Sequence, residues 1–283
     1  MNAIELSHIR KSFGDFAIRD LNLTVPSGTI CGLVGENGAG KSTTIRLLMG
    51  ALRPDSGTAA VLGVDVSSPE FQQVKEDVGV VLDEAFFPEV LSPADIGKVM
   101  ALTYRRWDAA QYARYLEQFS LPMKQPFKEF SRGMKMKLAI AVALSHQAKL
   151  LILDEATSGL DPMARDEILD IFNEYTRQED HSVLLSSHIV SDLEKICDYI
   201  AFLHKGQLLL CEEKDRLLEE YALVRLSRER LADLPEDSVV GKTCSEYGAR
   251  ALVLRSKVPY DLPLEHTTLE DIILFLAKGG AQA

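Results

Sequence analysis

Short apolar runs alternate with segments of helical periodicity along much of the chain. The runs TICGLVG at 29–35, LLILDE at 150–155 and SVLLSSH at 182–188 are short and largely apolar, which is typical of buried strands. Pro26, Ser27 and Gly28 supply the turn before the first run. The stretch 136–144 (MKLAIAVAL), which follows Ser131, carries an apolar face of alanine and leucine and indicates a long helix. Strands that alternate with helices predict an α/β fold with a mostly parallel, doubly wound sheet.

Three further regions complete the predicted domain organisation. The strand-like runs at 3–9 and 16–25 predict an N-terminal antiparallel β subdomain. The segment at about 86–130 is helical in pattern and rich in aromatic and charged residues, which indicates an inserted helical subdomain. We therefore predict one large domain over residues 1–220 and a small C-terminal α+β appendage over 221–283.

Turn and capping residues predict where several elements begin or turn. Pro162 is expected to open a helix, and Lys205–Gly206 is expected to turn a hairpin. Ser68 is expected to cap a helix. In the last helix, Thr267 and Glu270 have the spacing of a capping box.

Composition excludes several classes of protein. The formal net charge of -11, from 42 acidic and 31 basic residues, repels phosphate backbones, so nucleic acid is not expected as a partner. No apolar run approaches the roughly 18 residues of a membrane-spanning helix, and the first residues lack the apolar core of a secretory signal. The four cysteines lack metal-ligand spacing and are expected to be buried or incidental thiols.

The segment Gly35–Ser42 (GENGAGKS) fits the phosphate-binding P-loop pattern, between a predicted strand and a predicted helix. Glycines allow backbone N–H groups to point at phosphate oxygens, and the helix N-terminus adds partial positive charge. Lys41 is predicted to bridge the β- and γ-phosphates of a nucleotide, and Ser42 to ligate Mg²⁺. The nucleotide-contacting residues predicted here are Gly35, Asn37, Gly38, Ala39, Gly40, Lys41, Ser42 and Thr43.

Two carboxylates end the apolar strand LLILDE, at the edge of a doubly wound sheet where ligands bind. Asp154 is the predicted acceptor of Mg²⁺-bound water. Glu155 is the predicted general base for the water that attacks the γ-phosphate. Taken alone, the pair is equally consistent with a solvated turn, and a P-loop with such a strand also fits a kinase or a GTPase.

The ordered set of motifs resembles the ATP-binding subunits of ABC (ATP-binding cassette) transporters over about residues 1–220. The matching features are Phe13 before a glycine, the P-loop, Asp83 after a strand, FSRGM at 130–134, LLILDE, SGLD at 158–161 and His188 after a strand. The resemblance implies ATP and Mg²⁺ as ligands, ATP hydrolysis, and a pair of subunits, either two copies or a copy with a sister subunit. It also implies an integral membrane permease as partner and a peripheral position on the cytoplasmic face of the cell membrane.

The resemblance also implies roles for single residues. Phe13 would stack on adenine, and Ser131 with Gly133 would face a γ-phosphate held by the partner subunit. His188 would hold the γ-phosphate or the attacking water, and Asp161 would help the two subunits communicate.

Two departures from the family pattern stand out. The family's signature motif, which we call the signature segment, lies here at residues 131–134 and reads SRGM where S-G-G-Q is usual. Arg132 and Met134 therefore replace a glycine and a glutamine. Asp83 stands where the family has a glutamine, and it would ligate Mg²⁺ directly or through water. Both departures resemble bacterial ABC exporters of drugs, peptides or lipids.

Two alternatives to a transporter motor follow from the sequence: a soluble ABC-family ATPase, and a nucleotide-dependent regulator that is not coupled to transport. The short span between P-loop and signature and the acidic charge argue against the first. Glu155 and His188, if they act as implied, argue against an inactive regulator.

Overall fold

The computed structural model describes residues 1–245 and 248–279 and contains three sheets. The central six-stranded sheet has the order β10-β9-β3-β8-β7-β6, in which only β10 runs antiparallel to its neighbour. All residues of its middle strands are buried, as their continuous apolar runs predict. The strands are β3 (Ile30–Val34), β6 (Val78–Val81), β7 (Leu150–Asp154), β8 (Ser182–Ser187), β9 (Tyr199–His204) and β10 (Gln207–Glu213).

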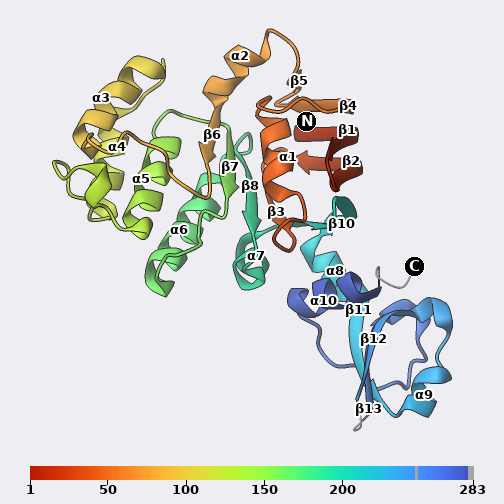
Figure 1. Cartoon of the computed structure of the whole chain (residues 1–283). Coiled ribbons are helices and arrows are strands. Elements are labelled where there is room, and N and C mark those ends of the chain that lie inside the picture. The colour runs from red at the N-terminus through yellow and green to blue at the C-terminus, as the bar shows by residue number, and fades with distance from the viewer. Residues whose placement is uncertain (246–247, 280–283) are drawn as a thin grey trace.

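The N-terminal sheet is antiparallel, with the order β2-β1-β4-β5. Its strands are β1 (Asn2–Phe13), β2 (Phe16–Pro26), β4 (Ser56–Val61) and β5 (Val64–Asp65). Helix α1 (Lys41–Leu48) lies between this sheet and the central sheet (Figure 1). Ile45, Leu47 and Leu48 of α1 are buried in one hydrophobic cluster with residues of both sheets, so the P-loop helix is held from two sides.

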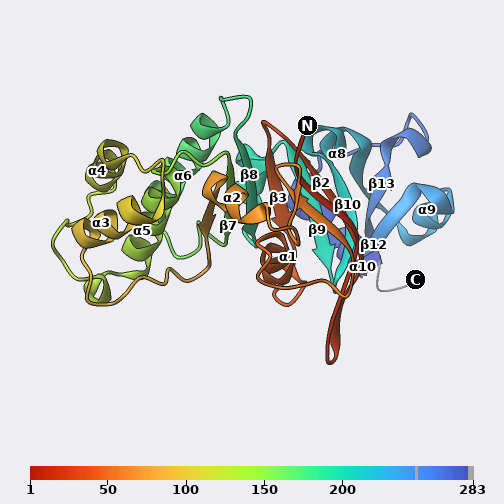
Figure 2. The ribbon, with the colours of Figure 1, turned by 90° about the horizontal axis from the view of Figure 1, so that it is seen from above.

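A group of helices lies at one end of the molecule and the C-terminal sheet at the other (Figures 1 and 2). Helix α3 (Pro93–Thr103) begins with a capping box between Ser92 and Asp95. Tyr112, on α4 (Ala109–Gln118), packs into the cluster that joins these helices to the central sheet. The remaining helices before β9 in the chain are α2 (Phe71–Val74), α5 (Arg132–Leu144), α6 (Pro162–Tyr175) and α7 (Val190–Ile196), with short 3₁₀ turns η1 (Lys75–Asp77) and η2 (Phe127–Glu129).

The C-terminal sheet is antiparallel with the order β11-β13-β12, and it begins at Tyr221. Helix α10 returns toward α7, and its Leu269, Ile272 and Phe275 are buried in the same cluster as the helical group and one face of the central sheet. The elements are α8 (Lys214–Glu220), β11 (Tyr221–Leu226), α9 (Arg228–Ala232), β12 (Val239–Ser245), β13 (Gly248–Leu254) and α10 (Leu269–Gly279), with η3 (Glu236–Ser238) and η4 (Arg255–Lys257).

The fold class predicted from the sequence is confirmed, and so are the helix start at Pro162 and the hairpin turn at Lys205–Gly206. Two predicted caps are wrong. Helix α2 begins only at Phe71, because Asp65 accepts hydrogen bonds from the Ser67 backbone and hydroxyl and holds the preceding segment in a turn.

The helix cap predicted at Thr267 is formed instead by the next residue, Thr268. The hydroxyl of Thr268 accepts from the backbone N–H of Asp271 and donates to its carboxylate, whereas Thr267 is buried. Within the described residues, no helix is both long enough and apolar enough to cross a membrane.

Candidate functional site

The parallel strands bring the chemistry-bearing residues to one edge of the central sheet. The P-loop follows β3, His188 follows β8, Glu155 follows β7 and Asp83 follows β6. Because these four strands are neighbours in the order β3-β8-β7-β6, their carboxyl ends place the four segments side by side.

The P-loop is shaped by two glycines that no other residue could replace without strain. Gly40 caps α1 in the left-handed region at φ 114°, and a Cβ on Gly35 would lie 2.3 Å from the carbonyl oxygen of Leu203. Lys41 begins the helix, and only 6% of its side chain is exposed. Its Nζ donates to the Gly35 carbonyl oxygen at 2.7 Å, so the ammonium is folded back under the loop.

Glu155 links the P-loop lysine to the histidine. Its Oε1 lies 3.4 Å from Lys41 Nζ, and its Oε2 lies 2.6 Å from His188 Nδ1. The backbone of Glu155 is left-handed at φ 52°, and its N–H donates to the Ser186 carbonyl at 3.0 Å. A non-glycine residue in this conformation is uncommon, and the hydrogen bond to Ser186 helps to fix it.

Asp154 is the last residue of β7 and is buried. Its carboxylate accepts a hydrogen bond from the hydroxyl of Ser186 on β8, which fixes its orientation at the strand end. Ser186 was not predicted from the sequence. The sequence could have indicated it, because a serine near the end of a buried parallel strand needs a hydrogen-bond partner.

A cavity of about 280 Å³ opens above the P-loop. Its lining contains most of the predicted P-loop residues together with Asp83 and Glu155. Phe16 also lines it, whereas Phe13 does not and is 43% exposed at the end of β1. Phe13 and Phe16 face each other across the tip of the β1–β2 hairpin, so the pairing register could have indicated the second ring. The lining residues are Phe16, Glu36, Asn37, Gly38, Gly40, Lys41, Ser42, Thr43, Asp83 and Glu155.

Ser131 and Gly133 lie at the start of α5 and are not among the described residues that line this cavity. The Ser131 hydroxyl accepts from the backbone N–H of Met134 at 3.2 Å and caps the helix. Asp161 caps α6 in the same way and accepts from the N–H of Ala164 at 3.0 Å, which lowers the pKa of Asp161. Ser131 and Gly133 therefore do not contribute to the P-loop cavity of their own chain, although Arg132 between them contacts Asp83 in its lining.

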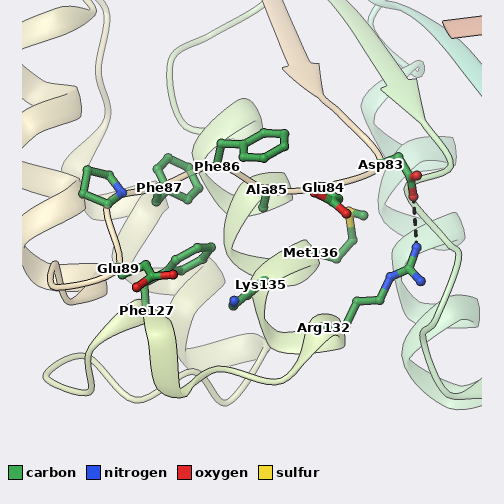
Figure 3. A pocket seen from close by; sticks show the side chains of 11 residues that line it. Asp83, Glu84, Ala85, Phe86, Phe87, Glu89, Phe127, Arg132, Lys135 and Met136 are labelled. Atoms are coloured by element: carbon green, nitrogen blue, oxygen red, sulfur yellow. Dashed lines mark hydrogen bonds and ion pairs between the residues drawn. The ribbon is translucent and has the colours of Figure 1, made fainter.

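Asp83 also lines a larger hollow of about 810 Å³ beside the helical group (Figure 3). The Arg132 guanidinium reaches the Asp83 carboxylate from the first turn of α5, with Nη2 at 2.9 Å from Oδ1. Phe86, which is 76% exposed, and Lys135 belong to the same hollow. We call this hollow the α5 groove, and its lining is Asp83, Glu84, Ala85, Phe86, Phe87, Pro88, Glu89, Phe127, Arg132, Lys135 and Met136.

The fold and this edge of the sheet define a P-loop nucleotide-binding protein. Residues 18–158 match the family described as ABC transporter. The chain is 34% identical over 215 residues to the lantibiotic transport ATP-binding protein SrtF of Streptococcus pyogenes, covering 75% of this chain and 91% of that protein. It is 28% identical over 225 residues to the ABC transporter ATP-binding protein YtrB of Bacillus subtilis, covering 79% and 76% of the two chains.

Solved structures of ATP-binding cassettes have the same fold as this chain. A structure described as the ATP-binding subunit of an ABC transporter matches with a TM-score of 0.69 and 28% identity over 77% of this chain and 92% of that chain. The ATP-binding cassette MJ0796, described as a post-hydrolysis dimer bound to ADP and phosphate, has the same fold, with a TM-score of 0.66 and 18% identity over 74% of this chain and 98% of that chain. The chain belongs to the ABC transporter family and is an ATP-binding, ATP-hydrolysing subunit of an ABC transporter. The family and the ATPase activity expected from the motifs are thereby confirmed.

Proposed function

We propose that this subunit works in a pair, closes around two ATP molecules, and drives export through a membrane permease. The observation that carries the proposal is the contact of Glu155 with both Lys41 and His188 beside the P-loop cavity. A base, a phosphate-binding cation and a second polar group are brought within hydrogen-bonding or ion-pair range from three different elements. This arrangement suits the attack of water on a γ-phosphate.

Each residue has a role that follows from its surroundings. Lys41 exchanges its contact with Glu155 for the β- and γ-phosphates, and Glu155 is then free to take a proton from water. His188 orients that water or the γ-phosphate through the ring that now contacts Glu155. Asn37, Gly38, Ala39, Gly40 and Thr43 surround the phosphates with their backbone, and Phe13 stacks on the base from the hairpin tip.

The residues of this site fit a Mg²⁺ ion that would be coordinated by both the protein and the nucleotide. Ser42, Asp83 and Asp154 offer the oxygen donors that Mg²⁺ prefers, and Asp154 is held in place by Ser186. The described residues contain no cluster of three or more acidic, histidine or cysteine side chains that would hold a metal alone. Phosphate oxygens and water would complete the coordination, and the ion would supply charge neutralisation at the γ-phosphate.

The pairing of subunits is proposed because Ser131 and Gly133 do not reach the P-loop cavity of their own chain. Ser131 and Gly133 lie at a helix N-terminus, which favours an anion, but they do not line the P-loop cavity of their own chain. A second subunit related by a two-fold axis brings its signature segment to this cavity, and both sites are completed at once. Asp161, at the start of α6, follows Gly159 and Leu160, which lie next to Arg132 and Gly133, and it communicates across the pair.

The permease docks in the α5 groove, at the cytoplasmic face of the membrane. The groove offers an exposed aromatic ring at Phe86, next to the half-buried Phe87, with charged residues around it. Asp83 lines both the groove and the P-loop cavity. Relatives of this chain are named for lantibiotic transport, bacitracin transport and Nod factor export. We propose export of an amphiphilic peptide or lipid-like compound by the same arrangement. We further propose that residues 1–220 form the motor domain, that about 86–130 form its helical subdomain, and that 221–283 are accessory.

Co-purification with a candidate permease, chosen as a multi-span membrane protein whose gene lies beside this one, tests this proposal. Phe86→Ser should reduce the amount retained on the tagged permease by at least about tenfold, because docking buries an apolar ring. Leu102→Ser is the matched control, since Leu102 is 91% exposed on α3 and is not part of the α5 groove. Equal retention of both variants would contradict docking in the groove, and the absence of substrate-stimulated ATPase in the purified complex would contradict transport.

A further inference from the structure

The two departures from the family pattern contact each other. Asp83 replaces a neutral glutamine with an anion, and Arg132 replaces a glycine with a cation. Their side chains meet at 2.9 Å although they lie 49 residues apart in the chain. Figure 3 shows Arg132 extending from the first turn of α5 to the Asp83 carboxylate at the end of β6. The two substitutions therefore act as one feature of the site.

The charge around the P-loop cavity explains why a carboxylate there would need a partner. Among the described lining residues, Glu36, Asp83 and Glu155 are acidic and Lys41 alone is basic. ATP brings several negative charges into this cavity. An unpaired Asp83 would oppose it, because like charges repel over several ångströms even in a solvated site.

Stability of the fold gives no comparable reason for the pair. The two side chains are 60% and 55% exposed, and ion pairs at such exposure add little to folding stability. The stem of Arg132 also lies against Gly159, where its Cδ would be 3.2 Å from a Cβ on that glycine. The Arg132 side chain therefore contacts both Gly159 of the SGLD turn and Asp83.

We propose that Arg132 is a positioning and charge-compensating residue, which neutralises Asp83 so that the P-loop cavity can accept a polyphosphate. This inference rests on the proposed function, because it takes ATP as the occupant of the cavity. It predicts that the contribution of Arg132 depends on the phosphate charge of the ligand and on the presence of Asp83. A purely structural role would depend on neither.

The test is a set of nucleotide-binding titrations on the full chain in EDTA, where no metal links Asp83 to the nucleotide. Arg132→Gln should weaken ATP binding by roughly 3- to 10-fold, and ADP binding by less, because the repulsion from Asp83 scales with phosphate charge. Arg132→Lys should bind ATP like the wild type. Asp83→Asn combined with Arg132→Gln should restore the wild-type affinity to within about twofold, because the repelling carboxylate is gone.

Two controls separate this effect from others. Arg177→Gln removes a comparably exposed arginine, paired with Glu174 at 2.7 Å near the far end of α6, and should leave ATP binding unchanged. High salt should shrink the effect of Arg132→Gln, because it screens exposed charges. Wild-type affinity in Arg132→Gln, equal losses for ADP and ATP, or no restoration in the double variant would each overturn the inference. Failure of the wild type itself to bind ATP more tightly than Lys41→Ala would instead overturn the proposed nucleotide site.

Discussion

At the scale of single residues, the side chains of the P-loop site contact one another. Lys41 is nearly inaccessible to solvent, and a buried ammonium requires partners. It finds them in the carboxylate of Glu155 and the carbonyl of Gly35. In the proposed mechanism the γ-phosphate replaces the first of these partners, so that ATP binding frees Glu155 to act as the base.

This exchange predicts the outcome of Glu155→Gln. Turnover should fall by about 10²- to 10⁴-fold, because a positioned base is lost. ATP binding should be kept or become tighter, because Lys41 no longer has a competing carboxylate. Steady-state phosphate release and equilibrium titration measure the two quantities, with Glu174→Gln as a control at an exposed glutamate on α6. Turnover at the wild-type rate would show that another group is the base.

The residues of this site differ in how far the sequence could predict them. Gly35–Ser42, Asp154 and Glu155 are recognisable because each chemical role depends on neighbours in the chain and on a strand end. Phe16 and the Asp83–Arg132 pair could not be predicted in this way, because they depend on which side chains the fold brings together across strands and helices.

At the scale of elements, continuous apolar runs and turn chemistry predicted the central strands and the β9–β10 hairpin. Local hydrogen bonding decided the details that they missed. Asp65 accepts a hydrogen bond from the backbone of Ser67 and holds the segment before α2 in a turn. In α10, the backbone N–H of Asp271 donates to Thr268 rather than to Thr267. Such competition between nearby polar side chains shifts helix ends by a residue or two.

The packing of α3 on α4 gives a prediction at this scale. A Cβ on Gly97 would lie 2.7 Å from the ring of Tyr112, which is buried and donates from its hydroxyl to the Pro93 carbonyl at 3.0 Å. Gly97→Ala should therefore lower the free energy of unfolding by about 1–3 kcal/mol through overpacking. Helix propensity alone predicts a gain of about 1 kcal/mol.

Chemical denaturation of the two glycine variants decides between these effects. Gly133→Ala is the matched control in α5, because its added Cβ would meet Leu160 and Gly159 at ordinary contact distances of 3.5 and 3.7 Å. It should cost little stability. A stabilised Gly97→Ala variant would mean that α3 and α4 are not packed as the structure has them.

At the scale of the whole molecule, the chain is an ATPase subunit with an appendage that shares its core. The sequence predicted a change of character after about residue 220, and the structure shows a separate sheet there. The sequence could not show that α10 packs back onto the core, because the apolar face of an amphipathic helix does not indicate which surface it will cover.

The most direct test of the account is whether two chains share each ATP. Cysteines are placed at Ser131 in one population and at Asn37 in another, on a Glu155→Gln background that retains ATP, with Cys211 and the exposed Cys244 replaced by serine. The account predicts a disulfide between the two populations with ATP and none with ADP or without nucleotide. Cross-linking within a single chain that carries both cysteines, or between chains regardless of nucleotide, would contradict it.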